Sequence, residues 1–322
     1  MNPTTNGATM LLTGATSGLG LSMARLLAGV PDWTVVATAR SGTRAEELRA
    51  LIGDPANFRY VVCDQADLAS VRDAGSRINE LVATQSIPPL RSLVLNAGIQ
   101  TGSTDSATVD GYELTFGTNL VGPHLLVGLL SGALTAPARI ICVGSGTHYG
   151  KFRRSYGMVA APRWEAPQIL AKPRAGDGIR AYSTSKLATL YWVHELARRA
   201  PRHIDAICYD PGMMPGTGLA RDRSAIERFG WKYLLPAMRV VPGVSTPKRS
   251  ATNLTAIATA NTPIPEVDLR GGYVEIDHLV PSSPDSYDPE REHELFEFLD
   301  TTTGLGSHPV APWWSGGSQP ID

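Results

Sequence analysis

The sequence predicts an α/β protein with a doubly wound parallel sheet flanked by helices. Short β-rich runs alternate with longer helical patterns through the first two-thirds of the chain, and several runs are continuously apolar, as strands covered on both faces are. The predicted strands are 8–13, 33–39, 58–63, 91–95, 139–144 and 204–209. The predicted helices are 18–29, 43–52, 67–84 with Asp67 as N-cap, 110–134, and 179–200 before Pro201.

The composition is that of a globular enzyme. Of 322 residues, 43% are hydrophobic and 18% are charged, which supports a packed core and argues against disorder. The 29 basic and 30 acidic side chains leave a net charge of −1, so nothing favours a nucleic-acid partner. The 32 glycines indicate tight turns or backbone that approaches a ligand closely.

Three further features argue against a disulfide-bonded, metal-binding, secreted or membrane protein: the cysteines, the histidines and the N-terminal residues. No CxxC pair is present, and each cysteine lies in an apolar run, which favours buried thiols in a reducing cytoplasm: Cys63, Cys142 and Cys208. The histidines that we considered as metal ligands lack ligand spacing, so no metal site is expected: His148, His194 and His203. The first residues contain neither a charged n-region nor a long apolar segment, so neither a signal peptide nor a membrane span is expected.

Each predicted strand delivers small or polar residues at its carboxyl end. In a parallel sheet these ends meet at one edge, and ligands bind there. The residues in question are Thr13 and the loop 14–20, Arg40, Asp64, Asn96-Ala97-Gly98, Ser145 and Pro211-Gly212. This edge is the predicted ligand site.

The loop 14–20 has the spacing GxxxGxG. Such a match is weak by itself, but here it follows a strand and opens a helix. Small residues permit this turn and let backbone N–H groups approach a pyrophosphate at the helix N-terminus. The context therefore predicts a dinucleotide site.

Arg40 indicates which dinucleotide binds. An NAD site usually supplies an acidic side chain about 20 residues after the glycine loop, whereas here Ala39-Arg40-Ser41 occupies that place and the first carboxylate is Glu46. A guanidinium suits a 2′-phosphate, which favours NADP(H). The alternative is a solvated arginine at a strand end.

Tyr182 and Lys186 are four residues apart on a predicted helix and therefore share one face. A nearby ammonium is expected to lower the pKa of a tyrosine toward a value useful in acid/base chemistry. A lone YxxxK is usually a solvated helix face. Ser145, at the end of the preceding strand, favours the catalytic interpretation because its hydroxyl could bind a carbonyl oxygen to which Tyr182 gives a proton.

Together these residues resemble the short-chain dehydrogenase/reductase family, which implies a Rossmann-type fold. The family's motifs occur in the family's order: TGATSGLG at 13–20, Asp64, NAG at 96–98, Asn119, Ser145, YSTSK at 182–186 and PG at 211–212. The resemblance covers about 10–280. Within the family, the stretches 110–126, 211–219 and 303–305 look closest to the branch that contains retinol dehydrogenases and protochlorophyllide reductases.

The resemblance implies a catalytic role for four residues. Tyr182 would be the general acid/base, and Lys186 would bind the nicotinamide ribose and tune that tyrosine. Ser145 would orient the substrate oxygen, and Asn119 would hold a water in a proton relay. Taken alone, Asn119 could equally be a helix cap or a buried amide.

The resemblance also implies the contacts of the cofactor, from its phosphates and adenine to the nicotinamide. The implied residues are Gly14, Thr16, Ser17, Gly18, Leu19, Gly20, Arg40, Asp64, Asn96, Ala97, Gly98, Tyr182, Lys186, Pro211, Gly212 and Met213. Asp64 would touch adenine, and residues 211–213 would border the nicotinamide.

The chain departs from the family pattern at several places. Gly144 stands where many members have the first of two serines, and 36 residues separate Ser145 from Tyr182 instead of about a dozen. Leu95 replaces the cysteine that protochlorophyllide reductases have before NAG, which counts against chlorophyll chemistry. The first residues do not resemble the N-terminal membrane anchor that is common in retinol dehydrogenases, so no such anchor is expected.

Two segments bear on the substrate. The insertion 146–181 carries seven basic residues (151, 153, 154, 163, 172, 174 and 180) against Glu165 and Asp177, which favours a carboxylate or phosphate on the substrate; the alternative is a solvated basic loop. An apolar stretch over 229–235, which includes Phe229, Trp231 and Tyr233, suits a hydrophobic substrate. Its alternatives are internal packing or a homodimer surface.

We therefore expect one domain over 1–322. It would comprise a cofactor-binding and catalytic core at about 8–210, a substrate lid at 213–245, a final strand (271–276) and acidic helix (288–300) within 271–305, and an irregular tail at 306–322. The expected activity is NADP(H)-dependent interconversion of a ketone or aldehyde and an alcohol on a hydrophobic small molecule. The alternatives are reduction of a C=C bond and a non-catalytic dinucleotide sensor or interaction protein.

Overall fold

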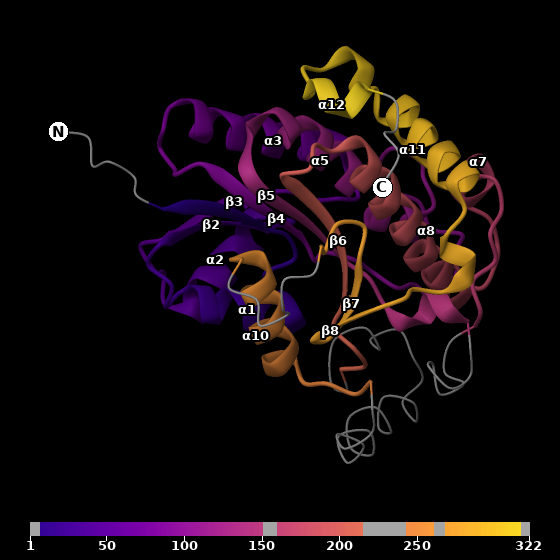
Figure 1. Cartoon of the computed structure of the whole chain (residues 1–322), viewed down its shortest axis with the longest axis horizontal. Coiled ribbons are helices and arrows are strands. Elements are labelled where there is room, and N and C mark those ends of the chain that lie inside the picture. Colours follow the sequence, from indigo (N-terminus) through magenta and orange to yellow (C-terminus); the bar gives the residue numbers. More distant parts are fainter. Residues whose placement is uncertain (1–6, 151–159, 215–242, 261–267, 317–322) are drawn as a thin grey trace.

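A computed structural model of the chain describes residues 7–150, 160–214, 243–260 and 268–316, and it contains one eight-stranded sheet (Figure 1). The strand order is β3-β2-β1-β4-β5-β6-β7-β8. All neighbouring strands are parallel except β7 and β8. The strands are β1 (Ala8–Leu12), β2 (Trp33–Ala39), β3 (Phe58–Val62), β4 (Leu90–Leu95), β5 (Leu134–Val143), β6 (Ile204–Asp210), β7 (Tyr273–Glu275) and β8 (His278–Val280). The predicted parallel sheet is confirmed.

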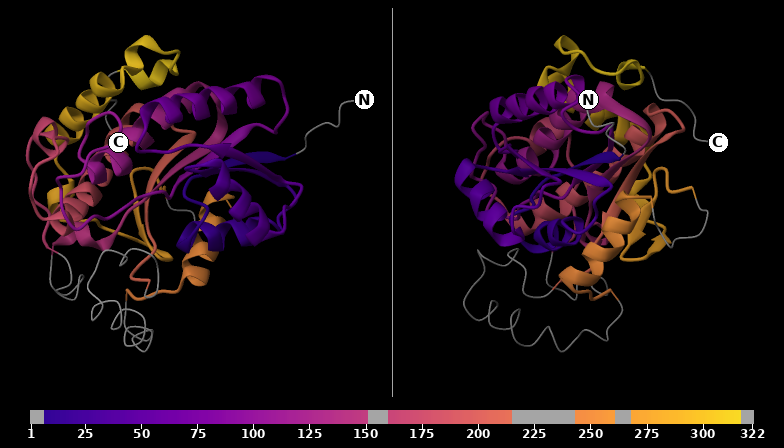
Figure 2. Two further views of the ribbon diagram at one scale, coloured as in Figure 1. Left: turned by 180° about the vertical axis from the view of Figure 1, so that it is seen from behind. Right: turned by 90° about the vertical axis from the view of Figure 1, so that its left-hand side faces the viewer.

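Helices cover both faces of the sheet, so the apolar strands are buried from both sides (Figure 2). One face carries α1 (Gly18–Leu27), α2 (Gly42–Ile52) and α10 (Pro247–Ala258), with α1 packed on α10. The other carries α3 (Leu68–Ala83), α5 (Gly122–Leu130), α8 (Gly178–Arg199) and α11 (Pro289–Thr303). A separate hydrophobic cluster fills each interface.

Local signals in the sequence set several helix ends. The Asp67 carboxylate accepts from the N–H groups of Ala69 and Ser70, as the prediction of this N-cap requires. Asp177 caps α8 in the same way, and α8 ends just before Pro201. These caps place the start of α8 at residue 178, one residue from its predicted start.

The predicted helix over 110–134 is only partly correct. It begins as α4 (Leu114–Phe116), widens into a π-helical segment (Gly117–Val121), continues as α5 and ends in a short 3₁₀ turn (Ser131–Ala133). Glu113 caps its start, because its buried carboxylate accepts from the N–H groups of Thr115 and Phe116. Leu134 belongs to β5, which therefore begins five residues before the predicted strand.

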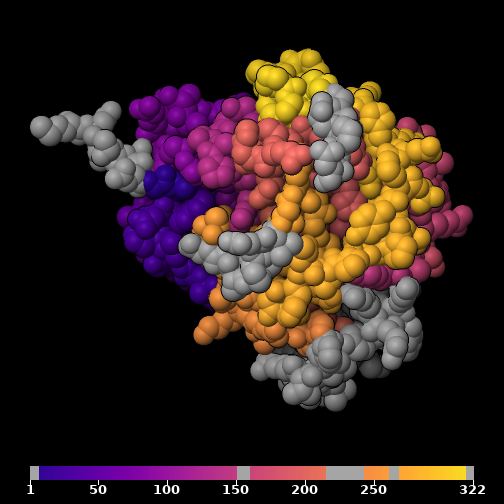
Figure 3. Space-filling model, in the orientation of Figure 1, coloured from indigo at the N-terminus to yellow at the C-terminus, as the bar shows by residue number. Residues whose placement is uncertain are grey.

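The C-terminal region has more structure than predicted. Its acidic helix is present as α11, but the supposedly irregular tail contains α12 (Pro312–Ser315), and α10 and β8 are further additions. Trp314 on α12 is 1% exposed, packs against His124 and donates from its indole to Asp300. Figure 3 shows these C-terminal residues, in yellow, along one flank of the surface. The packing of Trp314 against His124 thus gives residues 312–315 of the tail a defined structure.

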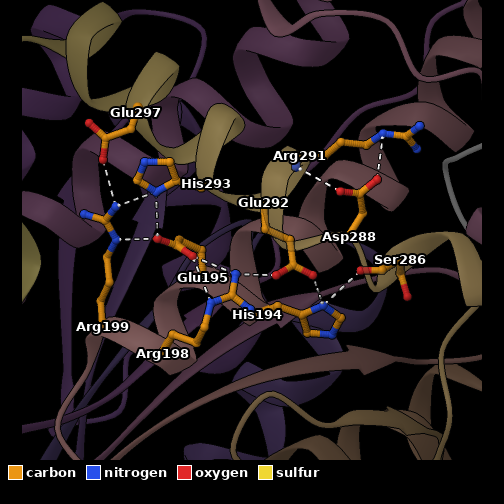
Figure 4. Close-up of polar contacts among 10 residues, drawn as sticks. All are labelled: His194, Glu195, Arg198, Arg199, Ser286, Asp288, Arg291, Glu292, His293 and Glu297. Carbon is orange, nitrogen blue, oxygen red and sulfur yellow. Dashed lines mark hydrogen bonds and ion pairs between the residues drawn. The ribbon is translucent and has the colours of Figure 1, made fainter. Parts of the chain in front are cut away.

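A buried network of charges fastens α11 to α8 (Figure 4). Glu292 of α11 accepts from Nδ1 of His194 at 2.9 Å and from the guanidinium of Arg198. Glu195 accepts from both Arg198 (2.7 Å) and Arg199 (2.8 Å). Because both carboxylates are at most 1% exposed, each needs these donors to remain charged in the interior.

One helical stretch in the described part of the chain is long and apolar enough to cross a membrane. It spans Leu114–Ala133, and 89% of its most apolar window is buried inside the molecule, as in a core helix of a globular protein. This stretch is the one that carries Asn119. The expectation that the chain has no membrane span stays a prediction.

Candidate active site

The register of the sheet brings the predicted site residues to one edge. Leu12 of β1 is paired with Val94 of β4, Leu95 with Cys142 of β5, and Val143 with Tyr209 of β6. The residues that follow these positions are therefore neighbours across the sheet: Thr13-Gly14, Asn96-Ala97-Gly98, Ser145 and Pro211-Gly212. The sequence predicted this arrangement from strand ends alone.

The glycine loop is shaped for close approach of backbone to a ligand. Gly14 has φ +67°, and a Cβ on Gly20 would lie 2.3 Å from the Gly14 carbonyl oxygen, so neither position accepts a side chain. The side chain of Ser17, the N-cap of α1, makes no capping hydrogen bond. The first turn of α1 therefore keeps N–H groups for an anion.

Asn96 and Thr13 lock this loop to the end of β4. The Asn96 amide donates to the carbonyl oxygens of Thr13 (2.9 Å) and Gly14 (3.1 Å), and Thr13 Oγ1 accepts from the N–H of Ala97 at 3.0 Å. Asn96 and Ala97 were predicted as cofactor contacts, whereas Thr13 was predicted only as a residue of the ligand edge. Its signal was available, since it is a threonine at the end of an apolar strand directly before the loop.

Arg40 and Asp64 lie where β2 and β3 end. Arg40 is exposed and precedes α2, whose N-cap Ser41 accepts from the N–H of Arg44. Asp64 accepts from the N–H of Ala66 at 3.0 Å. Neighbouring Gln65 is buried, and its amide has no partner among the described residues. Both residues lie at the ligand edge of the sheet, and their contacts with a cofactor stay predictions.

Tyr182 and Lys186 occupy one face of α8 and are both 7% exposed. The Lys186 ammonium lies 5.5 Å from the centre of the Tyr182 ring and donates to the Val143 carbonyl oxygen at 2.8 Å. A Cβ on Gly98 would lie 3.8 Å from Nζ of Lys186, so the NAG turn is adjacent. The predicted pair is therefore assembled beside the predicted cofactor edge.

The pKa of Tyr182 differs from the sequence-based expectation. Burial raises it to about 12, a hydrogen bond with Ser145 lowers it, and the charge of Asp210 raises it. Burial also lowers the pKa of Lys186, against the charges of Cys208, Cys142 and Asp210, which raise it. In this structure desolvation outweighs the expected effect of the ammonium on the tyrosine.

Ser145 lies within reach of Tyr182, as the catalytic interpretation requires. It is the N-cap of a short 3₁₀ turn (Gly146–Tyr149) and hydrogen-bonds Tyr182. Position 144, directly before Ser145, carries glycine for a steric reason. A Cβ on Gly144 would lie 2.5 Å from Sγ of Cys208, which is fully buried on β6. The departure at 144 therefore accommodates the cysteine at 208.

Asn119 lies in the π-helical segment, a geometry frequent at functional sites. Its Oδ1 accepts from the N–H of Ile99 at 2.8 Å, and its Nδ2 donates at 3.0 Å to both the Ile99 carbonyl and Ser185 Oγ. The side chain thus joins the residue after NAG to the catalytic helix. Its role in holding a water stays a prediction, and Ser185 is a contact that the sequence analysis missed.

The Pro211-Gly212 turn follows β6. Gly212 has φ +73°, and a Cβ there would lie 2.9 Å from the Gly243 carbonyl oxygen. Met213 forms a parallel bridge with Val244, so the two flanks of 215–242 are paired. The apolar stretch over 229–235, predicted to belong to a lid, lies outside the described residues.

The described part of the basic insertion is neutralised only in part, because Glu165 and Asp177 stand against four basic residues, of which Lys172 is exposed. The Glu165 carboxylate forms ion pairs with Arg163 at 3.3 Å and with Arg174 at 2.7 Å. The Arg180 guanidinium lies 3.9 Å from the Asp177 carboxylate. Residues 151, 153 and 154 lie outside the described residues. The three described arginines therefore support an anionic substrate less than the sequence suggested.

Comparison with known proteins gives the family. A family model for short chain dehydrogenases matches residues 8–157. The chain is 26% identical to rice protochlorophyllide reductase B over 93% of its length and 78% of the relative's, and 34% identical to mouse retinol dehydrogenase 14 over 60% and 57%. The solved structure of an NADPH-bound carbonyl reductase from chicken fatty liver is 20% identical, with a TM-score of 0.61 over 86% of this chain and 99% of that one, and shows the fold alone.

The matches to known proteins thus indicate the same family as the sheet, the glycine loop and the Tyr182–Lys186 pair. The chain belongs to the short-chain dehydrogenase/reductase family, in the branch of the protochlorophyllide reductases and retinol dehydrogenases. It is an oxidoreductase of this family, whose members bind NAD(P)H and act on small molecules.

Proposed function

We propose that this protein is an NADP(H)-dependent oxidoreductase that interconverts a carbonyl group and an alcohol on a largely hydrophobic small molecule. The observation that carries the proposal is the Tyr182 hydroxyl, hydrogen-bonded to Ser145 and adjacent to the Lys186 ammonium at the end of the sheet where the glycine loop lies. Acid/base chemistry on an oxygen needs such a group within hydrogen-bond reach of the substrate.

The residues at this edge fit a dinucleotide. The glycine loop and the N-terminus of α1 would hold the pyrophosphate, and Asn96-Ala97-Gly98 would lie beneath the cofactor. When bound, the nicotinamide supplies or accepts the hydride. The protein contributes orientation and the proton.

The side chains have distinct tasks in reduction. The Ser145 hydroxyl donates a hydrogen bond to the substrate carbonyl oxygen, and Tyr182 gives its proton to that oxygen. Because burial raises the pKa of Tyr182 to about 12, the phenol is protonated at neutral pH and ready to act as the acid. Lys186 places a positive charge beside the tyrosinate that forms and stabilises it.

The preference for NADP(H) rests on Arg40. Its side chain is exposed at the end of β2, where a guanidinium meets a 2′-phosphate, and it makes no ion pair with the described residues. The NADPH-bound carbonyl reductase of similar fold supports this choice.

Titration of the protein with NADPH and NADH, followed by cofactor fluorescence, tests this preference. Arg40→Glu should weaken NADPH binding by roughly ten- to a hundredfold, because a charge-assisted bond is worth about 1.5–3 kcal/mol, and should leave NADH binding nearly unchanged. Arg25→Glu, the same charge change in the last turn of α1, is the control and should bind both cofactors like the parent. Equal affinity of the parent for NADPH and NADH would contradict the preference.

Reduction of a C=C bond is the second candidate, favoured by the match to rice protochlorophyllide reductase over most of both chains. Leu95 stands against chlorophyll chemistry itself. A panel of apolar ketones, aldehydes and enones with NADPH, with product analysis by NMR, separates the two candidates. Alcohols as products, lost in Tyr182→Phe, support carbonyl reduction, whereas saturated ketones support the second candidate. Absence of any turnover would contradict both.

A further inference from the structure

Asp210 is a buried carboxylate at the carboxyl end of β6, and the sequence analysis did not single it out. It is 3% exposed and directly precedes the Pro211-Gly212 turn. Its Oδ1 accepts from the N–H of Gly212 at 2.9 Å, and its Oδ2 accepts from the Tyr273 hydroxyl at 2.5 Å. Both donors favour the ionised form of a carboxylate.

The same carboxylate reaches the end of β5. A Cβ on Gly146 would lie 3.2 Å from Oδ2 of Asp210, a tight contact, so the residue after Ser145 lies directly against this carboxylate. Asp210 therefore contacts the ends of three neighbouring strands: β5 through Gly146, its own β6 through Gly212, and β7 through Tyr273. One side chain therefore lies against the residue that follows Ser145 and binds the Pro211-Gly212 turn.

Asp210 also acts on the catalytic pair through its charge. After burial and the Ser145 hydrogen bond, its charge is the third influence on Tyr182, whose pKa it raises, and it raises the pKa of Lys186 as well. A negative charge in this buried site opposes a second one, the tyrosinate, and supports the ammonium.

We propose that Asp210 is a positioning residue of the active site, whose carboxylate ties the Ser145 strand end to the Pro211-Gly212 turn and keeps the proton on Tyr182. This inference rests on the proposed function, because Tyr182 must lose its proton before it can act as the base in alcohol oxidation. The charge of Asp210 would therefore raise the pH at which oxidation sets in.

Other titratable groups face the same region and share its proton balance. They are Lys186 on α8, Cys142 on β5, Cys208 and Tyr209 on β6, Tyr273 and Glu275 on β7, and His148 and Tyr149 on the 3₁₀ turn after β5. The test must therefore isolate Tyr182 from the other tyrosines.

The titration of Tyr182 tests the inference without a substrate. Tyrosinate absorbance is followed from neutral to alkaline pH, and the curve of the same protein carrying Tyr182→Phe is subtracted to leave Tyr182 alone. Asp210→Asn, which keeps the shape but removes the charge, should lower the midpoint by about one pH unit. Asp205→Asn, which removes a carboxylate from the other end of β6, should leave the midpoint unchanged.

Two further variants keep the test decisive. Asp210→Ser is also neutral, and its hydroxyl can accept from the Gly212 N–H, so it carries the test where Asp210→Asn does not fold. Tyr273→Phe removes the hydrogen bond but keeps the charge and should not lower the midpoint. A wild-type midpoint in both neutral variants, or the same shift in Asp205→Asn, would overturn the proposal.

Enzyme kinetics separate this inference from the proposed function. In alcohol oxidation with NADP⁺, where Tyr182 must give up its proton, the rise of kcat with pH should move to lower pH in Asp210→Asn. Ketone reduction at neutral pH should not lose its acid in this variant, because Tyr182 remains protonated there in both proteins. If the whole substrate panel stays inert but the Tyr182 midpoint still falls in Asp210→Asn, the proposed function fails and the role of Asp210 stands. If the panel is active and the midpoint is unchanged, only the role of Asp210 fails.

Discussion

Asn119 and Ser185 join two helices of the candidate active site through a single hydrogen bond, in which the Asn119 amide donates to the Ser185 hydroxyl at 3.0 Å. The donor lies in a π-helical segment and the acceptor lies one residue before Lys186. The same amide also binds both backbone groups of Ile99, directly after the NAG turn. One side chain therefore connects the predicted cofactor edge to α8, which carries Tyr182 and Lys186.

Asn119→Ala should destabilise the fold by about 1–3 kcal/mol, because it removes the partners of the half-buried backbone groups of Ile99 and of the buried Ser185 hydroxyl. NADPH affinity should fall as well, since the loop after Gly98 loses its anchor. Asn79→Ala, which removes a single bond to the Leu129 carbonyl, is the control and should cost about 1 kcal/mol with no change in affinity. Urea unfolding and cofactor fluorescence measure both; equal losses in the two variants would contradict this.

Gly144→Ser restores the serine that many relatives carry, yet it should destabilise this chain by about 1–3 kcal/mol. The new Cβ would lie 2.5 Å from Sγ of Cys208, which is enclosed in the core. Cys208→Ala removes that sulfur, so the double variant should recover most of the loss. A double-mutant cycle by urea unfolding measures the coupling, and strictly additive effects would show that the two residues do not compete for space.

Glu292→Ala should cost about 2–3 kcal/mol of stability, because His194 loses its carboxylate in the buried α8–α11 interface and Arg198 keeps only its bonds to Glu195. Glu80→Ala removes an exposed ion pair with Arg77 and should cost at most about 1 kcal/mol. Thermal and urea unfolding of both variants give the comparison. Similar small losses would mean that packing alone holds α11 in place.

His124 should make the fold sensitive to mild acid. It is fully buried, its Nε2 lies 2.8 Å from Asp300, and burial lowers its pKa below the ordinary 6.5, against the effect of Asp300. The unfolded chain therefore binds this proton first as the pH falls. The stability that neutral His124 contributes is fully present above pH 6.5. It is lost progressively as the pH falls from 6.5 to the lowered pKa of the folded state.

Urea unfolding at neutral and acidic pH measures this loss. His124→Gln cannot bind the proton, so its free energy of unfolding should fall less between the two pH values than that of the parent. Each unit by which the pKa is lowered corresponds to about 1.4 kcal/mol. An identical pH dependence in parent and variant would assign the acid sensitivity to other groups.

Signals between near neighbours in the chain allowed much of the fold to be predicted. The six apolar runs became β1 to β6, Asp67 caps α3 as predicted, and the glycine loop opens α1. The order of these strands then placed Asn96, Ser145 and Pro211 at one edge, because parallel strands end together. Local propensity and the topology of a parallel sheet are sufficient for this much.

Contacts between distant residues decided the remainder. The short helix α12 forms where Trp314 packs against His124. The absence of a side chain at Gly144 is explained only by Cys208 on the neighbouring strand. The burial that raises the pKa of Tyr182 likewise exists only in the folded chain.

The sequence by itself determined the sheet, the glycine loop and the spacing of Tyr182 and Lys186, because each depends on residues a few positions apart. Only the tertiary structure placed the charge of Asp210 beside that pair and bonded it to Tyr273, 63 residues away. A charge changes the acid/base behaviour of a site through its distance and its desolvation, and neither exists until the chain has folded.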